Sequence, residues 1–285
     1  MPELPEVETV IRALRPNLIS LDIVDIDIRY ENIIEDDIDY FKRNVIGKKI
    51  TDINRLGKFI IFNLNNGNII SHLRMEGKYY YLPKDNVDDK HIHVIYYLSN
   101  GYMLCYRDVR KFGRMIYKEN EELYTTKPLN NIGIDLILTK KFEIQTIYDK
   151  IIKSPLPIKT KLLDQGIISG LGNIYVDEVL FAAKINPKRL SNTITISELE
   201  RIIEESIRIL NKAIEYKGTT IRSYTSSLGV TGEYQNHLLV HTKKICPICN
   251  SKIVKEKVVG RGTYYCKNCQ RWQNEKNYWY NRWNC

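Results

Sequence analysis

The sequence lacks the features of a membrane or secreted protein. It has no run of 18 apolar residues that could span a bilayer, and its acidic N-terminus has no apolar segment typical of a secretory signal. It also has no internal repeat and no low-complexity linker. We therefore expect a cytoplasmic protein. Because the cytoplasm is reducing, we expect its six cysteines to be thiols or metal ligands.

Positive charge is concentrated at the C-terminal end. The 285 residues include 43 Lys and Arg against 34 Asp and Glu, a formal net charge of +9. Residues 243–285 contain ten basic and two acidic residues, so most of the excess lies there. A basic module at one end of a near-neutral chain favours a polyanionic partner, above all nucleic acid. A plain solvated basic tail is the less favoured alternative, because cysteines and aromatic residues interleave with the charge.

Four cysteines have the spacing of a zinc site. Cys246 and Cys249 form one Cys-x2-Cys pair, and Cys266 and Cys269 form a second pair after 16 intervening residues. The intervening segment has the pattern of a short hairpin. Four thiolates leave no open coordination position, so the metal would be structural. The alternatives are paired disulfides and a coincidental spacing.

Two regions differ in hydrophobic periodicity. Residues 22–117 alternate between polar and apolar side chains, with turn signals at Asn66-Gly67 and Asn100-Gly101, which predicts an antiparallel β-sandwich. One helix is expected before it, at residues 5–17. Helical spacing follows at 142–153, 159–165, 174–184 and 197–217, with a capping box at Ser197 to Glu200. The buried stripe predicted for the first helix consists of Leu4, Val7, Val10, Ile11 and Leu14.

The N-terminus is a candidate reaction centre. Removal of Met1 would leave Pro2 as a secondary amine beside the carboxylates of Glu3 and Glu6. An α-amino group titrates near pH ~7.7–8.0, so a useful fraction is nucleophilic at cellular pH. Added to a sugar C1′, a secondary amine gives an iminium ion, which is an electron sink. Alternatively, Pro2 and Pro5 only begin a helix whose positive end is favoured by the acidic residues.

A glycine-rich segment lies between two expected helices. Gly166, Gly170 and Gly172 permit a tight turn directly before Asn173. The Asn173 amide, or the free N–H groups of the following helix, could hold a phosphate. The alternative is a plain corner between two helices.

Six motifs together resemble one family, the bacterial formamidopyrimidine-DNA glycosylases, which remove oxidised purines such as 8-oxoguanine. They occur in the family's order: PELPE at 2–6, RLGK at 55–58, HLRMEG at 72–77, RDVRKFG at 107–113, GLGNIY at 170–175 and GRGTYYC at 260–266. The related endonuclease VIII enzymes excise oxidised pyrimidines and typically have glycine where this chain has Leu4. A catalytically silent zinc-ribbon DNA-binding protein would need neither Pro2 nor Glu3.

The resemblance implies an α+β fold with four parts. An N-terminal helix and an antiparallel β-sandwich form a catalytic domain at 1–133. A helix-two-turn-helix DNA-binding domain with a lesion-closing loop follows at 134–242. A four-cysteine zinc finger built on a β-hairpin occupies 243–272, and residues 273–285 form an extension of unknown role.

The resemblance also implies catalytic roles. Pro2 would attack C1′, Glu3 would handle the proton at the deoxyribose ring oxygen, and Glu6 would support the same site. Lys58 would act as an acid in β-elimination and contact a phosphate. Arg261 would serve δ-elimination and grip the leaving phosphate.

DNA contacts are implied by the same motifs. Met75, Arg110 and Phe112 would fill the space left by the flipped base, with Arg110 bonded to the orphaned cytosine. Without the resemblance, Met75 and Phe112 would be interpreted as core residues. His72 would also bind DNA, and contacts to the DNA backbone would come from His91, Lys159 and Asn173. The lesion would be bound by Glu76, Thr219, Ile221, Arg222, Ser223 and Tyr224.

The chain departs from the family pattern at three places. Val109 stands where proline is usual, and His241-Thr242-Lys243 replaces the more usual Tyr-Gly-Arg. The chain also continues beyond its last zinc cysteine through its only three tryptophans, beginning at Trp272. The implied partner is double-stranded DNA containing oxidised purines, and the implied cofactor is one structural zinc ion. We expect a monomer with no membrane and no obligatory protein partner.

Overall fold

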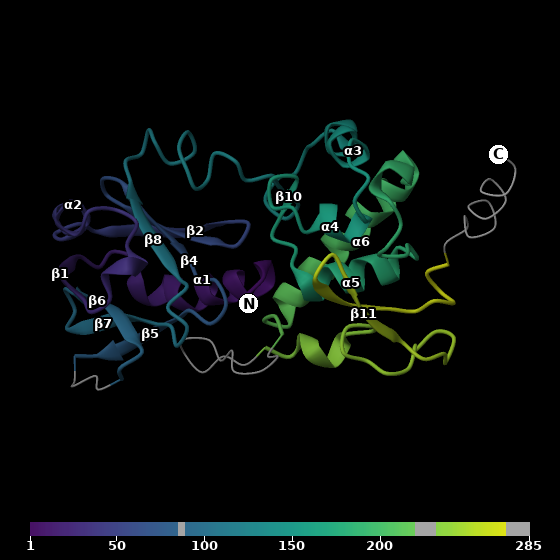
Figure 1. The fold of residues 1–285 in the computed structure, drawn as a ribbon. Coiled ribbons are helices and arrows are strands. Elements are labelled where there is room, and N and C mark those ends of the chain that lie inside the picture. The colour runs from purple at the N-terminus through teal and green to yellow at the C-terminus, as the bar shows by residue number, and fades with distance from the viewer. Residues whose placement is uncertain (85–88, 220–231, 272–285) are drawn as a thin grey trace, which may run out of the picture. The chain divides into compact units, whose positions relative to one another are not determined.

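The computed structural model describes residues 1–84, 89–219 and 232–271 (Figure 1). The chain divides into two compact units, one built from Met1–Ile132 and Lys212–Asn236, the other from Gly133–Asn211 and His237–Cys285. The sequence-based division instead placed all of 134–242 in one domain and the zinc finger in another. No described helix is long and apolar enough to cross a membrane.

The first unit begins with helix α1 (Leu4–Leu18). The predicted stripe is confirmed, since Leu4, Val7, Val10, Ile11 and Leu14 are all buried. The helix packs on strand β2, where the Arg15 guanidinium donates to the Ile53 carbonyl at 2.6 Å. α1 is therefore fixed in the unit by its whole apolar face.

The predicted antiparallel β-sandwich is confirmed (Figure 1). One sheet has the order β1-β6-β7-β5 and the other β2-β3-β4-β8. The bounds are β1 (Ile23–Ile28), β2 (Ile50–Leu56), β3 (Phe59–Leu64), β4 (Asn68–His72), β5 (Lys78–Pro83), β6 (Ile92–Leu98), β7 (Tyr102–Arg107) and β8 (Arg114–Lys118). The expected turns hold Gly67 and Gly101 at φ 87° and 81°, which favours glycine at both positions.

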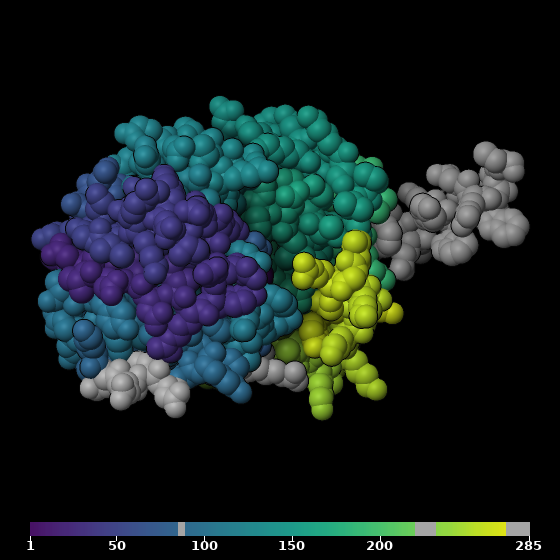
Figure 2. Space-filling view, turned by 60° about the vertical axis from the view of Figure 1, so that its left-hand side comes forward, coloured from purple at the N-terminus to yellow at the C-terminus, as the bar shows by residue number. Residues whose placement is uncertain are grey.

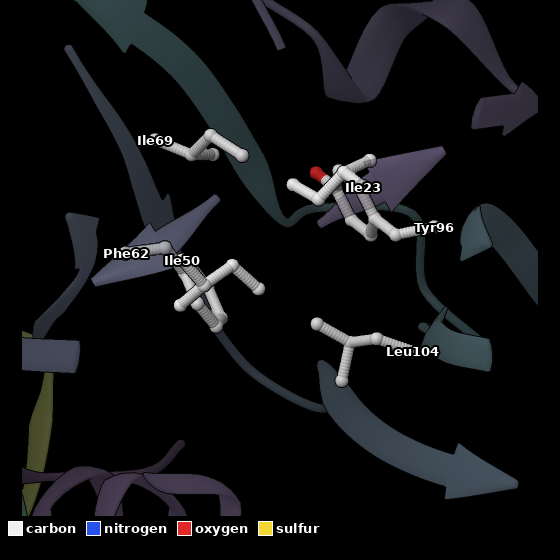
Figure 3. Close-up of a pocket in the computed structure, with 6 residues that line it drawn as sticks. All are labelled: Ile23, Ile50, Phe62, Ile69, Tyr96 and Leu104. Atoms are coloured by element: carbon white, nitrogen blue, oxygen red, sulfur yellow. The ribbon is translucent and has the colours of Figure 1, made fainter. Parts of the chain in front are cut away.

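The core of the sandwich lies between the two sheets. Figure 3 shows a small apolar pocket lined by three residues from each sheet: Ile23, Tyr96 and Leu104 from one, Ile50, Phe62 and Ile69 from the other. All six side chains are buried. The inward side of the alternating pattern therefore forms the interior that the sequence predicted.

Helix α2 (Ile38–Val45) was missed by the sequence analysis, which expected only strands after the first helix. The Asp37 carboxylate accepts the Tyr40 N–H at 2.9 Å and caps the helix. Phe41 and Val45, one turn apart, are both fully buried. Two apolar positions in a short helix are too few to outweigh the surrounding strand pattern. A short 3-10 helix (Glu31–Ile33) also lies in this region.

The second unit contains three of the four helices expected from periodicity and most of the fourth, with shifted ends. They are α3 (Ile144–Ile152), α4 (Ile158–Leu162), α5 (Asn173–Ala182) and α6 (Ile196–Glu215), with a short 3-10 helix (Ser191–Thr193) before α6. Two short strands, β9 (Ile134–Asp135) and β10 (Ile168–Ser169), pair in parallel. The zinc hairpin consists of β11 (Val254–Val258) and β12 (Arg261–Tyr265), paired antiparallel.

The capping box of α6 lies two residues earlier than predicted. The Thr195 N–H donates to the Glu198 carboxylate at 2.9 Å, and the Thr195 hydroxyl accepts the Glu198 N–H at 3.3 Å. The Ser/Thr-x-x-Glu pattern occurs twice in this overlap. The Arg189 guanidinium also binds Glu198, which favours the first of the two.

Candidate functional site

The N-terminal residues are buried and fixed by one carboxylate. Pro2 is buried, and Glu3 and Glu6 are 2% and 3% exposed. The Glu6 carboxylate accepts the Glu3 N–H at 2.8 Å through Oε2. Through Oε1 it accepts the Thr219 N–H at 2.7 Å and the Thr219 hydroxyl at 3.1 Å. Glu6 therefore both closes the first turn of α1 and joins the N-terminus to the chain after α6, so the two sequence interpretations are compatible.

Gly218 is a site residue that the sequence analysis missed. Its φ is 77°, and a Cβ placed on it would lie 2.6 Å from Glu6 Oε1. Both features require glycine, because a side chain there would be strained and would collide with the carboxylate. Thr219, the residue after Gly218, binds Glu6 across 213 positions of the sequence. No local sequence signal therefore marks Gly218 as a site residue.

Lys58 lies in the turn between β2 and β3 and is 5% exposed. The preceding Arg55 is also buried, and it donates to the Gly57 carbonyl at 3.1 Å and to Glu8 Oε2 at 3.0 Å. Glu8 belongs to α1, the helix that begins at the candidate nucleophile. The turn that carries Lys58 is therefore attached to α1 by a buried guanidinium.

His72 ends β4 and has a fixed tautomer. Its Nδ1 accepts the Arg74 N–H at 2.9 Å, so the proton of the neutral ring is on Nε2. The ring lies edge-on to Phe59 with centroids 4.7 Å apart. Burial first, and then the cations Arg74 and Lys58, lower the pKa of His72 to about 3. His72 is therefore a neutral N–H donor at physiological pH.

Asp108 organises the loop that carries Arg110 and Phe112. Its carboxylate, fully buried, accepts the N–H groups of Arg110, Phe112 and Gly113 at 3.0, 2.9 and 2.8 Å. The Arg110 guanidinium lies 4.6 Å from the centre of the Phe112 ring. The loop is thus held in place although Val109 replaces the usual proline. No local pattern in the sequence marks Asp108 for this role.

The candidate wedge residues lie on the surface. Met75 is 39% exposed and Phe112 is 45% exposed, which excludes the alternative that both are core residues. Large apolar side chains held outward beside an arginine fit insertion between bases. That role stays a prediction.

The remaining predicted residues of the first unit are less defined by their contacts. His91 is partly buried, with its N–H bonded to Asp89 at 2.8 Å and its carbonyl to the Asp108 N–H at 2.9 Å. Glu76 lies in the segment that connects β4 to β5 and is partly buried. Of the predicted lesion-binding residues after α6, Thr219 is placed as above. Ile221, Arg222, Ser223 and Tyr224 lie outside the described residues.

In the second unit, the N-terminus of α5 meets the zinc hairpin. The Asn173 amide, in the first turn of α5, donates to the Gly262 carbonyl at 2.9 Å. Gly262 follows Arg261, which is exposed at the start of β12 after a turn with positive φ at Val259 and Gly260. Gly170, in the predicted turn before Asn173, has φ 95°. The Asn173 amide joins the start of α5 to the Arg261 segment.

Lys159, a predicted contact to the DNA backbone, is bound within the protein. Lys159 is 1% exposed, and its ammonium donates to Asp177 at 2.7 Å, the Thr263 hydroxyl at 2.9 Å and the Gly262 carbonyl at 3.0 Å. Its contact with a DNA phosphate stays a prediction. A lone lysine in sequence carries no signal of such partners, because they lie 18 to 104 positions away.

The segment 239–242 is held by two buried carboxylates of α5. Glu178 accepts the N–H groups of Leu239, Val240 and His241 at 2.8, 2.9 and 2.7 Å. His241 Nδ1 lies 2.8 Å from Asp177 Oδ2. Thr242 has φ 64°, a conformation that favours the glycine more usual at this position.

The four cysteines of the predicted metal site come together. Their Sγ atoms all lie within 4.8 Å of one another, with Cys246 and Cys269 at 3.7 Å and Cys249 and Cys266 at 3.5 Å. A tetrahedral zinc ion with bonds of ~2.3 Å separates its sulfur ligands by about 3.8 Å, so the cluster fits zinc. The described cysteines form no disulfide. The zinc module, yellow in Figure 2, forms part of the surface of its unit.

Comparisons with known proteins agree over most of the chain. Residues 1–115 match the sequence model of the formamidopyrimidine-DNA glycosylase N-terminal domain, and residues 132–225 match that of the H2TH domain of the same enzymes. Residues 244–271 match a zinc finger found in FPG and IleRS. The zinc finger match and the cysteine cluster together establish one structural zinc site.

Relatives of known name cover nearly all of the chain. The formamidopyrimidine-DNA glycosylase of Streptococcus mutans is 44% identical over 275 residues, which are 95% of this chain and all of that protein. Structures of the Lactococcus lactis enzyme with Fapy-dG DNA, abasic-site DNA and oxidised-pyrimidine DNA are 38%, 39% and 38% identical, with TM-scores of 0.89, 0.88 and 0.88. Each covers 95% of this chain and 100% of its own. The chain belongs to the formamidopyrimidine-DNA glycosylase family.

Proposed function

We propose that this chain is a bifunctional DNA glycosylase and abasic-site lyase that removes oxidised purines from duplex DNA in base excision repair. The observation that carries the proposal is the buried N-terminus, where Pro2 and Glu3 precede α1 and the Glu6 carboxylate holds the Glu3 N–H. The named relative is a formamidopyrimidine-DNA glycosylase. Because the substrate is chromosomal DNA, we place this activity in the cytoplasm.

Base removal uses the amine of Pro2 after Met1 has been cleaved. The nitrogen lone pair forms a bond to C1′, the glycosidic bond breaks with its electron pair leaving on the base, and the base takes up the proton that the attached amine loses. Glu3 delivers a proton to the ring oxygen as the C1′–O4′ bond opens. The product is an open-chain iminium ion between Pro2 and C1′.

Two eliminations then cut the strand. Loss of the C2′ proton forms the C2′=C3′ bond as the C3′–O bond breaks toward its phosphate, with Lys58 as the acid. Loss of the C4′ proton forms the C4′=C5′ bond as the C5′–O bond breaks toward the second phosphate, which Arg261 receives. Water releases the sugar remnant from Pro2. The gap left in the DNA carries a phosphate at each end.

The exposed wedge supplies access to the base. Phe112 and Met75 would occupy the stack once the lesion has turned out, and Arg110 would hydrogen-bond the orphaned cytosine. Arg110 also stacks on Phe112, so the two side chains would enter side by side.

Oxidised pyrimidines are the second candidate substrate class. One of the Lactococcus lactis structures contains DNA with an oxidised pyrimidine. Leu4 favours purines, because it stands where the pyrimidine-specific relatives typically have glycine. Excision rates on matched duplexes with 8-oxoguanine or an oxidised pyrimidine would decide between the two.

The test is a blocked N-terminus. A tag fused ahead of Pro2 converts its nitrogen to an amide, so base excision and borohydride trapping on an 8-oxoguanine duplex should both disappear. Binding by mobility shift at fixed salt should persist, because phosphate contacts do not need the amine. The same tag at the C-terminus is the control. Excision at the normal rate by the N-terminally blocked protein would show that the nucleophile lies elsewhere.

A further inference from the structure

Lys159 is the most completely buried cation of the described second unit. It is 1% exposed, in a four-membered arrangement with Asp177, Thr263 and Gly262 that joins α4, α5 and β12. Asp177 is itself 1% exposed. A buried ion pair is a poor source of net stability, since the desolvation of both charges offsets their attraction. Its value lies in fixing one geometry among these three elements.

The Gly262 carbonyl is the point where this geometry bears on the proposed chemistry. It accepts both the Lys159 ammonium at 3.0 Å and the Asn173 amide at 2.9 Å. Gly262 directly follows Arg261, and the turn on its other side consists of Val259 and Gly260 at φ 46° and 77°. The adjacent Arg261 carbonyl accepts the Thr263 hydroxyl at 2.9 Å, so side chains hold two successive carbonyls at the β12 end of that turn.

The opposite side of Asp177 completes the arrangement. Asp177 Oδ1 binds Lys159, while Oδ2 accepts the Tyr264 N–H at 3.1 Å and lies 2.8 Å from His241 Nδ1. The His241 and Tyr264 rings lie 4.8 Å apart. Asp177 thus holds β12 directly through its backbone and indirectly through Lys159.

We propose that Lys159 is a positioning residue for δ-elimination. It sets the backbone that carries Arg261 against the N-terminus of α5, so that Arg261 meets the phosphate leaving C5′. This inference rests on the proposed function. In the δ step the C4′ proton is lost, its electron pair forms C4′=C5′, and the C5′–O pair departs with the phosphate. Base excision and imine formation depend on Pro2 and Glu3 and do not need Lys159.

The experiment uses the full chain and a duplex with a preformed abasic site, which bypasses base excision. Lys159→Met removes the ammonium and keeps the chain length. The ratio of β- to δ-elimination product should rise by about tenfold or more, because small misplacements of a positioned group cost this much. Borohydride trapping should stay within about twofold of the parent protein, and zinc content should be unchanged.

Further variants separate positioning from a general loss of structure. Lys161→Met is the matched control, because Lys161 lies on the same helix and pairs with Asp164 instead. Arg261→Ala should raise the same ratio, and the double variant should be no worse than Arg261→Ala alone, as expected for residues acting through one group. If Lys159→Met does not fold, Lys159→Gln removes the charge but keeps a hydrogen-bond donor, and it should raise the ratio by about threefold.

Four outcomes would overturn the proposal. An unchanged product ratio in Lys159→Met, or in Lys159→Gln where the first variant does not fold, with Arg261→Ala still raising it, would show that Lys159 has no positioning role. Additive effects in the double variant would mean that Lys159 does not act through Arg261. A ratio raised equally by Lys161→Met would assign the effect to lost charge. Absence of trapping in the parent protein would overturn the proposed function itself, and this inference with it.

Discussion

Replacement of Glu6 tests the arrangement that holds the candidate nucleophile. Glu6 is 3% exposed and its two oxygens face three donors, the Glu3 N–H on one side and the Thr219 N–H and hydroxyl on the other. In Glu6→Gln one oxygen becomes an NH2 group, which cannot accept a hydrogen bond. The amide would keep its oxygen toward the two Thr219 donors. The Glu3 N–H would then face a donor in the interior.

The cost follows from the contacts. An unsatisfied buried N–H costs about 1 to 3 kcal/mol, and the two surviving bonds lose their charge assistance. The free energy of unfolding should therefore fall by about 2 to 4 kcal/mol. The same loosening displaces Glu3, which adjoins the nucleophile. We expect the rate of borohydride trapping to fall by about tenfold or more, since 1.4 kcal/mol is a factor of ten.

Two measurements check this prediction. Urea unfolding followed by circular dichroism gives the stability, and trapping on an abasic-site duplex gives the rate of imine formation. Glu121→Gln is the control, because Glu121 is exposed, and it should change stability by less than about 0.5 kcal/mol. Wild-type stability together with wild-type trapping in Glu6→Gln would refute the role assigned to this carboxylate.

Three further changes test the metal, the wedge and His72. Cys249→Ser should lose zinc and DNA affinity before the first unit unfolds; full affinity in zinc-free protein would contradict this. Arg110→Ala should weaken discrimination among bases opposite 8-oxoguanine by about 1 to 3 kcal/mol, measured as relative excision rates; an unchanged ranking would be contrary evidence. Because the pKa of His72 falls from about 6.5 unfolded to about 3 folded, stability should drop by about 2 kcal/mol from pH 7 to 5. In urea titrations at pH 7 and pH 5, His72→Gln should lack this part of the drop in stability. An equal loss of stability in the parent protein and in His72→Gln would argue against this role of His72.

Local patterns in the sequence predicted the elements of this protein well. The stripe from Leu4 to Leu14 gave α1, alternation and two Asn-Gly turns gave the sandwich, and the spacing of the cysteines gave the zinc site. Each of these signals is contained in a few neighbouring residues, and the physical cause is equally local: side-chain periodicity, turn conformation or a shared ion. The Asp37 cap was not enough to predict α2 from the sequence, because only two buried residues accompany it in that helix.

Tertiary structure alone decided what the polar side chains do. Lys159 is a solvated surface cation by any local criterion, yet it is buried because Asp177 and Thr263 meet it from 18 and 104 positions away. Met75 and Phe112 have the character of core residues, yet they are exposed. Asp108 holds the Phe112 loop outward. A charge or a large apolar group is stable wherever its partners compensate for desolvation, and those partners are assembled only when distant segments pack together.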